Sequence, residues 1–310
     1  MYRSNLTLWS MRAVFALLAL LAIGSSVAIV RGAQTNKPVL SIYREGVGFI
    51  RSDRSAAADL ATSPSGTLVP ADYDGDGRLD IGTWDASTGK WEIRKSIDGS
   101  NFSIVWGNSK NAQSVPVPAD FDGDGKADIA VWRRATGEWN ILNSSNNFDA
   151  AAATVIRLGA SGDIPVQADY DGDSKADAAV FRPAENRWYI RESRTGEIRR
   201  QIFGVAGTDL LVPADYTGDG KADIAVYRRG TWLVLNSETG ETEPFEFGFA
   251  DARPVPGDYN GDGQTDFAVF RKGKWYVYES GTPRLLSYTF GNENDLPICQ
   301  TMPKPSITGL

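Results

Sequence analysis

The chain has 310 residues, no histidine, one cysteine and a net charge of −7 at pH 7. The absence of histidine excludes histidine-ligated metal sites and the commonest general base, and a single cysteine excludes an intrachain disulfide. The net negative charge, together with the lack of a run of basic residues in the sequence, argues against a nucleic-acid partner.

The N-terminus carries a segment typical of export. Arg3 and Arg12 precede the apolar run Ala13–Ile23, and small residues follow it up to Ala28. We expect residues 1–33 to be a secretory signal peptide. An uncleaved membrane anchor is the alternative, because residues 13–30 are nearly long enough to span a bilayer. Both predict a secreted or cell-surface protein that contacts a membrane only through this segment.

An acidic nine-residue motif then occurs five times. Its first copies read Asp-x-Asp-Gly-Asp-Gly-x-x-Asp, and the copies begin 43 to 49 residues apart. Such self-similarity is typical of a repeat architecture. The copies are Asp72–Asp80, Asp120–Asp128, Asp169–Asp177, Asp215–Asp223 and Asp258–Asp266.

The motif has the chemistry of a calcium loop. Glycines at positions 4 and 6 let the backbone turn sharply, so that the side chains at positions 1, 3, 5 and 9 converge. Crowded carboxylates raise one another's pKa, and a hard cation with many oxygen ligands relieves the conflict. We therefore predict about five Ca²⁺ sites. Their side-chain ligands are Asp72, Asp74, Asp76 and Asp80; Asp120, Asp122, Asp124 and Asp128; Asp169, Asp171, Asp173 and Asp177; Asp215, Thr217, Asp219 and Asp223; and Asp258, Asn260, Asp262 and Asp266.

The five copies differ in quality. Ser174 replaces the position-6 glycine of the third copy and should strain its turn. Thr217 at position 3 is a weaker ligand than aspartate, whereas Asn260 at the same position of the fifth copy is a good neutral one. We expect the first two loops to bind most tightly and the fourth most weakly.

The segments around the loops predict an all-β fold. In the second repeat, strands are expected at Val115–Ala119, Asp128–Arg133, Trp139–Asn143 and Thr154–Gly159. Four short antiparallel strands per repeat indicate a β-propeller. Residues 39–44 match a second strand and residues 295–298 a first one, so the C-terminal strand should complete the N-terminal blade. We predict a six-bladed propeller over residues 39–301, followed by a tail at 302–310.

Two further series recur in the repeats. The aromatic residues in the second and third strands could form a sugar-stacking platform or pack blade against blade. The arginines after the second strand could bind an anion or be structural, stacked or paired between blades. The third-strand tryptophans are Trp91, Trp139, Trp188, Trp232 and Trp275, and the arginines are Arg44, Arg133, Arg182, Arg228 and Arg271.

The acidic loops, the second-strand pattern and the pairs Phe203-Gly204, Phe247-Gly248 and Phe290-Gly291 resemble the FG-GAP/VCBS repeats of the integrin α-chain head and of secreted bacterial proteins. The resemblance covers about Val39 to Thr301. It implies a calcium-stabilised propeller, extracellular adhesion or recognition, and ligation by the position-7 backbone carbonyl. The Gly-Ala-Pro part of the family motif is absent, and integrins have seven blades, so integrin-like ligand binding is not carried over. The position-7 residues are Arg78, Lys126, Lys175, Lys221 and Gln264.

Two classes of function follow. The first is a non-enzymatic recognition or adhesion module for an extracellular glycan or protein, with structural calcium. The alternative is a calcium-dependent extracellular lyase or hydrolase acting on polysaccharides. No residue constellation breaks the repeat symmetry, which disfavours catalysis. We expect ligand on the face opposite the calcium loops, at the connections Arg133–Glu138, Arg182–Arg187 and Gly107–Ser114.

Overall fold

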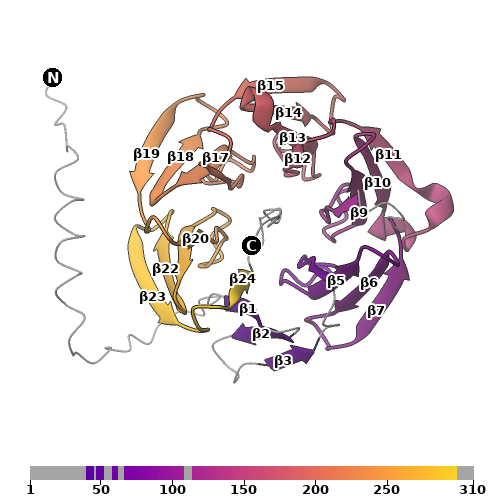
Figure 1. Ribbon diagram of the computed structural model, residues 1–310, viewed down its shortest axis with the longest axis horizontal. Helices are drawn as coiled ribbons and strands as arrows, with labels where there is room; N and C mark the ends of the chain where they lie inside the picture. Colours follow the sequence, from indigo (N-terminus) through magenta and orange to yellow (C-terminus); the bar gives the residue numbers. More distant parts are fainter. Residues whose placement is uncertain (1–39, 45–46, 52–57, 62–65, 108–113, 299–310) are drawn as a thin grey trace, which may run out of the picture. The chain divides into compact units, whose positions relative to one another are not determined.

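The computed structural model describes residues 40–298 except 45–46, 52–57, 62–65 and 108–113. The expected signal peptide or anchor at 1–33 and the tail at 302–310 lie outside these residues, so both stay predictions. Within the described part, no helix is long and apolar enough to cross a membrane. The strands lie inside the predicted 39–301 propeller and follow one another around a ring (Figure 1).

Five four-stranded antiparallel sheets each come from one contiguous stretch of sequence. We call them blades 1 to 5. Blade 1 contains β4 (Thr67–Leu68), β5 (Ile81–Asp85), β6 (Lys90–Arg94) and β7 (Asn101–Val105), and blade 2 contains β8 (Ser114–Pro116), β9 (Ile129–Arg133), β10 (Glu138–Leu142) and β11 (Thr154–Arg157). Blade 3 contains β12 (Ile164–Pro165), β13 (Ala178–Arg182), β14 (Arg187–Arg191) and β15 (Ile198–Ile202). Blade 4 contains β16 (Leu210–Leu211), β17 (Ile224–Arg228), β18 (Thr231–Leu235) and β19 (Thr242–Glu246), and blade 5 contains β20 (Arg253–Pro254), β21 (Phe267–Arg271), β22 (Lys274–Glu279) and β23 (Arg284–Thr289).

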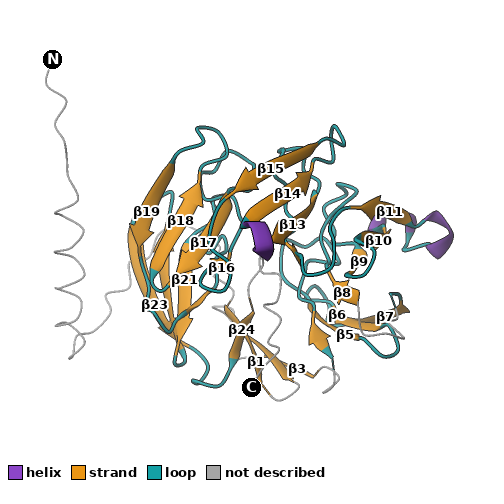
Figure 2. Cartoon of the chain, turned by 45° about the horizontal axis from the view of Figure 1, so that its top comes forward, coloured by secondary structure: helices purple, strands orange, loops and turns teal. Residues whose placement is uncertain are grey.

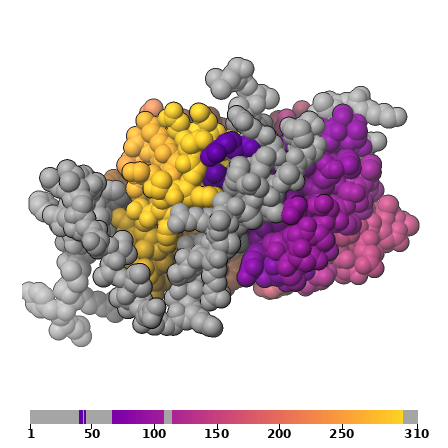
Figure 3. Space-filling view, turned by 90° about the horizontal axis from the view of Figure 1, so that it is seen from below, coloured from indigo at the N-terminus to yellow at the C-terminus, as the bar shows by residue number. Residues whose placement is uncertain are grey.

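A composite sheet joins the two ends of the ring. Its strands are β1 (Leu40–Arg44), β2 (Val47–Arg51), β3 (Ala58–Ala61) and, from the far end of the chain, β24 (Leu296–Ile298). β24 pairs antiparallel with β1, and Ser41 lies opposite Ile298. Seen from below, the indigo β1 surface lies beside the yellow C-terminal part of the sequence (Figure 3). The structure is thus an all-β propeller whose closure agrees with the expectation.

The expected strands of the second repeat appear in the expected order. The first strand is shorter than predicted and ends at Pro116, although the Val117 amide still donates to Ala130 of β9 at 2.8 Å. The helical content is three short 3₁₀ turns among the described residues, and all of them lie in connections (Figure 2). These turns are Ser144–Asn146, Ala150–Ala152 and Pro183–Glu185.

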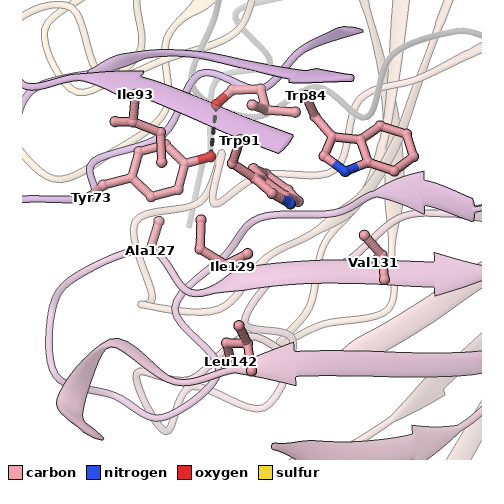
Figure 4. Packing of buried hydrophobic residues seen from close by; sticks show 9 residues of the cluster. Tyr73, Trp84, Trp91, Ile93, Ala127, Ile129, Val131 and Leu142 are labelled. Atoms are coloured by element: carbon pink, nitrogen blue, oxygen red, sulfur yellow. Dashed lines mark hydrogen bonds between the residues drawn. The ribbon is translucent and has the colours of Figure 1, made fainter. Parts of the chain in front are cut away.

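The recurring aromatic residues form the core between blades. The five third-strand tryptophans are fully buried. In blade 1, Trp91 packs with Tyr73 and Ile93 against Ile129 of blade 2 (Figure 4). Each indole N–H donates to the carbonyl of the residue before a glycine, as Trp188 does to Phe203 at 3.0 Å. These tryptophans therefore pack blade against blade, and burial rules them out as a sugar-stacking platform.

Most of the recurring arginines make ion pairs inside their own sheet. Arg182, at the end of β13, pairs at 2.9 Å with Asp163, which directly precedes β12. Pairing is therefore within a blade and not between blades as expected, because the connection that enters the first strand lies beside the end of the second. The other pairs of this kind are Arg44–Asp295, Arg228–Asp209 and Arg271–Asp251.

Candidate calcium sites

Each acidic motif forms a closed loop between the first and second strands of a blade. In every copy the residue before the motif forms a β-bridge with the position-9 aspartate, as Ala71 does with Asp80. Gly75 and Gly77 at positions 4 and 6 have φ angles of +82° and +78°, which glycine adopts without strain. Ser174 is forced into the same region, with φ +68°. The expected strain in the third loop is therefore visible in its backbone.

Three loops bring carboxylates together at positions 1, 3 and 9. Within each cluster the possible ligand oxygens lie within 4.8 Å of one another. The clusters fall in the first three copies, where the sequence keeps aspartate at all three positions. They are Asp72, Asp74 and Asp80; Asp120, Asp122 and Asp128; and Asp169, Asp171 and Asp177.

Backbone amides hold the position-1 aspartate in place. In the first loop, Gly75 N–H donates to Asp72 Oδ1 at 2.7 Å and Gly77 N–H donates to Asp72 Oδ2 at 2.8 Å. The same two bonds recur in the other four copies. Because the loop amides already fix this carboxylate, a cation would meet a preorganised ligand.

The position-9 aspartate is the buried member of each cluster. Asp128 accepts hydrogen bonds from the amides of Phe121 (2.8 Å) and Ser144 (2.7 Å), and none of its surface is exposed. Its pKa is raised to about 7, mainly by burial and to a lesser degree by the charges of Asp122 and Asp120, while the two amide hydrogen bonds act to lower it. Burial likewise raises the pKa of Asp80, Asp177 and Asp266 to about 6 and also raises that of Asp223. Such carboxylates gain from a cation that compensates their charge.

A serine outside the nine-residue motif, not predicted from the sequence, completes each loop. In blade 1, Ser96 follows the third strand, where its amide donates to Asp80 at 2.6 Å and its hydroxyl to Asp76 at 2.8 Å. The available signal was a serine 14 or 16 residues after every position-9 aspartate. The other members are Ser144, Ser193, Ser237 and Ser280. Their amides all bond the position-9 carboxylate, whereas the hydroxyl of Ser280 donates to the Thr265 carbonyl instead of to a loop aspartate.

The position-5 aspartates and the fourth and fifth loops differ from the predicted convergence of four side chains in every loop. The position-5 aspartates are not part of the three clusters; Asp76 instead accepts from Arg78 N–H at 2.9 Å as well as from the serine hydroxyl. In the fourth loop Thr217 Oγ1 donates weakly to Asp223 at 3.4 Å. In the fifth, Asn260 Nδ2 donates to Asp262 at 2.9 Å. Both loops keep the fold of the others but lack the carboxylate at position 3.

The loops of neighbouring blades are linked to one another. Ala127 N–H of blade 2 donates to the Asp72 carbonyl of blade 1 at 2.6 Å, and equivalent bonds join blades 2 to 3, 3 to 4 and 4 to 5. The position-7 side chains cross the same boundary: a Cβ added at Gly75 would lie 3.1 Å from Lys126. The conformation of each loop is therefore coupled to that of the loop in the next blade. Ligation by the position-7 carbonyls stays a prediction.

The donor set suits a hard divalent cation. All the clustered ligands are oxygens, they converge without help from nitrogen or sulfur, and one member of each cluster is buried. This chemistry favours Ca²⁺ over Zn²⁺. Within the described residues, three such clusters stand on one face of a closed ring of antiparallel sheets. The molecule is thus a β-propeller with acidic, calcium-type loops.

Residues 120–180, 169–226 and 215–269 match the FG-GAP-like repeat. The chain therefore carries FG-GAP-like repeats on a β-propeller fold, as the resemblance predicted. No curated protein sequence matches the chain significantly.

Solved structures share the fold at low sequence identity. A lectin of Agrocybe aegerita, which specifically recognises non-reducing terminal N-acetylglucosamine, is similar over 81% of this chain and 76% of its own, with 16% identity and a TM-score of 0.56. TolB of Acinetobacter baumannii is similar over 94% of this chain and 69% of its own, with 15% identity and a TM-score of 0.53. These likenesses concern the architecture alone.

Proposed function

We propose that the protein is a secreted or surface-exposed, calcium-binding recognition or adhesion module without enzymatic activity, whose ligand is a glycan or a protein. The observation that carries the proposal is the set of three converged aspartate clusters on a repeat scaffold. Their carboxylates are held by backbone amides, and backbone hydrogen bonds link the loops from blade to blade, so calcium would stiffen the ring and have no need to touch a substrate. The lectin that shares the fold supports a glycan ligand.

The proposal includes six blades and about five calcium ions. The composite sheet of β24 and β1–β3 has the four antiparallel strands of the other sheets and would be the sixth blade. The fourth and fifth loops keep the backbone bonds of the first three, and Thr217 and Asn260 offer an oxygen where the others offer a carboxylate. Calcium titration followed by native mass spectrometry would count the sites.

Chelation tests the structural role of calcium. A ligand that binds only the folded state stabilises it. At a free calcium concentration of ten times the Kd, each site adds about 1.4 kcal/mol to the free energy of unfolding. We expect the Tm to fall markedly when calcium is replaced by EDTA and to return when calcium is restored. An unchanged Tm would contradict the proposal.

Binding arrays test recognition. The calcium-loaded protein, applied to glycan and matrix-protein arrays, should bind a defined subset in a calcium-dependent way. Absence of binding on both arrays would count against recognition. Turnover of acidic polysaccharides by the same preparation would replace the proposal with the enzymatic alternative.

A further inference from the structure

Blade 2 lacks the acidic partner of its recurring arginine. Asp163 and Asp209 stand six residues before the first loop aspartate of blades 3 and 4, and each pairs with its arginine. Ser114 occupies this place in blade 2. Arg133 is exposed, and no ion pair joins it to any residue that the structure describes.

Blade 2 also lacks the side chain that fills the space beneath this arginine. In blade 3 the Arg182 guanidinium lies 4.4 Å from the ring centre of Tyr189, the residue after the third-strand tryptophan. In blade 5 the same position is Tyr276, which packs edge-on against Phe249 at 5.3 Å. In blade 2 this position is Asn140, whose side chain is much smaller.

The missing bulk leaves a cavity between blades 1 and 2. It has a volume of about 240 Å³ and is lined by Val105, Trp106, Gly107, Arg133 and Asn140. Trp106 is half-buried and rigidly held, because its indole N–H donates to the Asn140 carbonyl at 3.0 Å. Val105, which is 63% exposed, stands at the rim. Two of its lining residues, Gly107 and Arg133, are the first residues of connections where the sequence predicted a ligand.

The walls combine three kinds of contact. Arg133 offers a guanidinium that has no ion-pair partner among the described residues, Asn140 offers an amide, and Trp106 offers an aromatic surface. The nearby carboxylate of Glu138 does not neutralise Arg133, because Arg157 pairs with it at 3.1 Å. The volume is below the usual range for drug-sized ligands and suits one sugar ring.

We propose that this cavity binds a single acidic sugar of the hexuronate class. Arg133 would bind the sugar carboxylate through charge-assisted hydrogen bonds, Asn140 would bond a hydroxyl, and Trp106 would pack against the C–H face of the ring. An acidic peptide would use the arginine but not the aromatic wall. The inference rests on the proposed recognition function and names its ligand class and its site.

Calorimetric titration of the full calcium-loaded chain tests the ligand class. Methyl β-D-glucuronide is the probe, and methyl β-D-glucoside is the neutral control. We expect the glucuronide to bind at least tenfold more tightly, because a charge-assisted bond to Arg133 distinguishes them. Equal affinity for the two, no binding of the glucuronide, or equally tight binding of N-acetylglutamate would overturn the proposal.

Three variants test the location. Arg133→Gln should reduce glucuronide affinity at least tenfold, to the level of the glucoside. Asn140→Tyr introduces the side chain that blades 3 and 5 carry and should abolish binding of both sugars; Asn140→Leu, the residue of blade 4, serves if the tyrosine variant does not fold. Arg182→Gln is the matched control, because Arg182 already pairs with Asp163 and lies over the Tyr189 ring. This variant should bind the glucuronide as tightly as the parent.

Unchanged glucuronide binding in a folded Asn140 variant would overturn the site. Glycan-array binding that the Asn140 variants leave intact would refute this cavity while the proposed recognition function stands.

Discussion

Replacing Ser174 with glycine should stabilise the protein. Ser174 has φ +68°, its side chain is exposed, and the bond from its backbone amide to Asp169 Oδ2 at 2.8 Å survives the change. A non-glycine residue in this region costs about 1–2 kcal/mol. The more flexible unfolded state of glycine offsets about 0.5–1 kcal/mol of that. We therefore expect the free energy of unfolding to rise by about 0.5–1 kcal/mol.

The reverse substitution is the matched control. Gly125 holds the same loop position in blade 2 with φ +82°, and a Cβ added there would have no atom within 4 Å. Gly125→Ser should therefore cost about 0.5–1 kcal/mol through backbone strain alone. Urea unfolding in EDTA measures both variants without calcium, and equal m-values would show that the unfolded states match. If Ser174→Gly were no more stable than the parent, or Gly125→Ser were neutral, backbone strain would not explain the loop.

Three further changes have defined outcomes. Tyr170→Phe removes a buried hydroxyl that donates to the Val166 carbonyl at 2.6 Å and should cost about 1 kcal/mol in urea unfolding. Hydrogen bonds from Arg44 hold the pKa of Asp295 below its usual value, so this pair's stabilisation is present above about pH 4 and is lost as the pH falls; the stability advantage of the parent over Asp295→Asn should shrink in acid. Ser144→Ala removes the hydroxyl bonded to Asp124 at 2.8 Å and should weaken calorimetric calcium binding at one site by about tenfold.

Each of these has a control in the repeat itself. Blade 2 carries Phe121 where the other loops carry tyrosine, so Phe121→Leu has no hydroxyl hydrogen bond to lose and should leave the bond from Tyr170 to Val166 intact. If the difference in stability between the parent and Asp295→Asn did not change with pH, the ion-pair reasoning would be contradicted. Ser280→Ala should affect calcium less than Ser144→Ala, because the Ser280 hydroxyl bonds a backbone carbonyl instead of a loop aspartate; equal effects would contradict the role given to the serine.

The sequence was enough to predict the propeller, its closure and the acidic loops, because all three depend on spacing. The position of Asp72 relative to Asp80 follows from the turn that Gly75 and Gly77 allow, and the pattern of β24 matches the other first strands. These features are local or repeated, so a single chain contains the information several times.

Features that depend on contacts across the fold were not predictable in the same way. Ser96 lies on another connection from Asp80 and meets it only when the sheet forms. The partner of Arg182 was expected in a neighbouring blade, and the structure places it in the connection that enters its own sheet. The cavity beside Asn140 was the hardest feature to predict from the sequence, because it depends on side-chain volumes in two blades.

The composite sheet also dictates when the fold can be finished. The ion pair between Arg44 and Asp295 joins residues 251 positions apart. While the ribosome is still producing the last blade, β1 has no partner on its inner side, and the nascent chain carries an unpaired edge. Sealing that edge is a late, long-range event, the slowest kind of contact to form. Proteolysis that removed β24 would leave the edge of β1 unpaired again and free to pair with a strand of another chain.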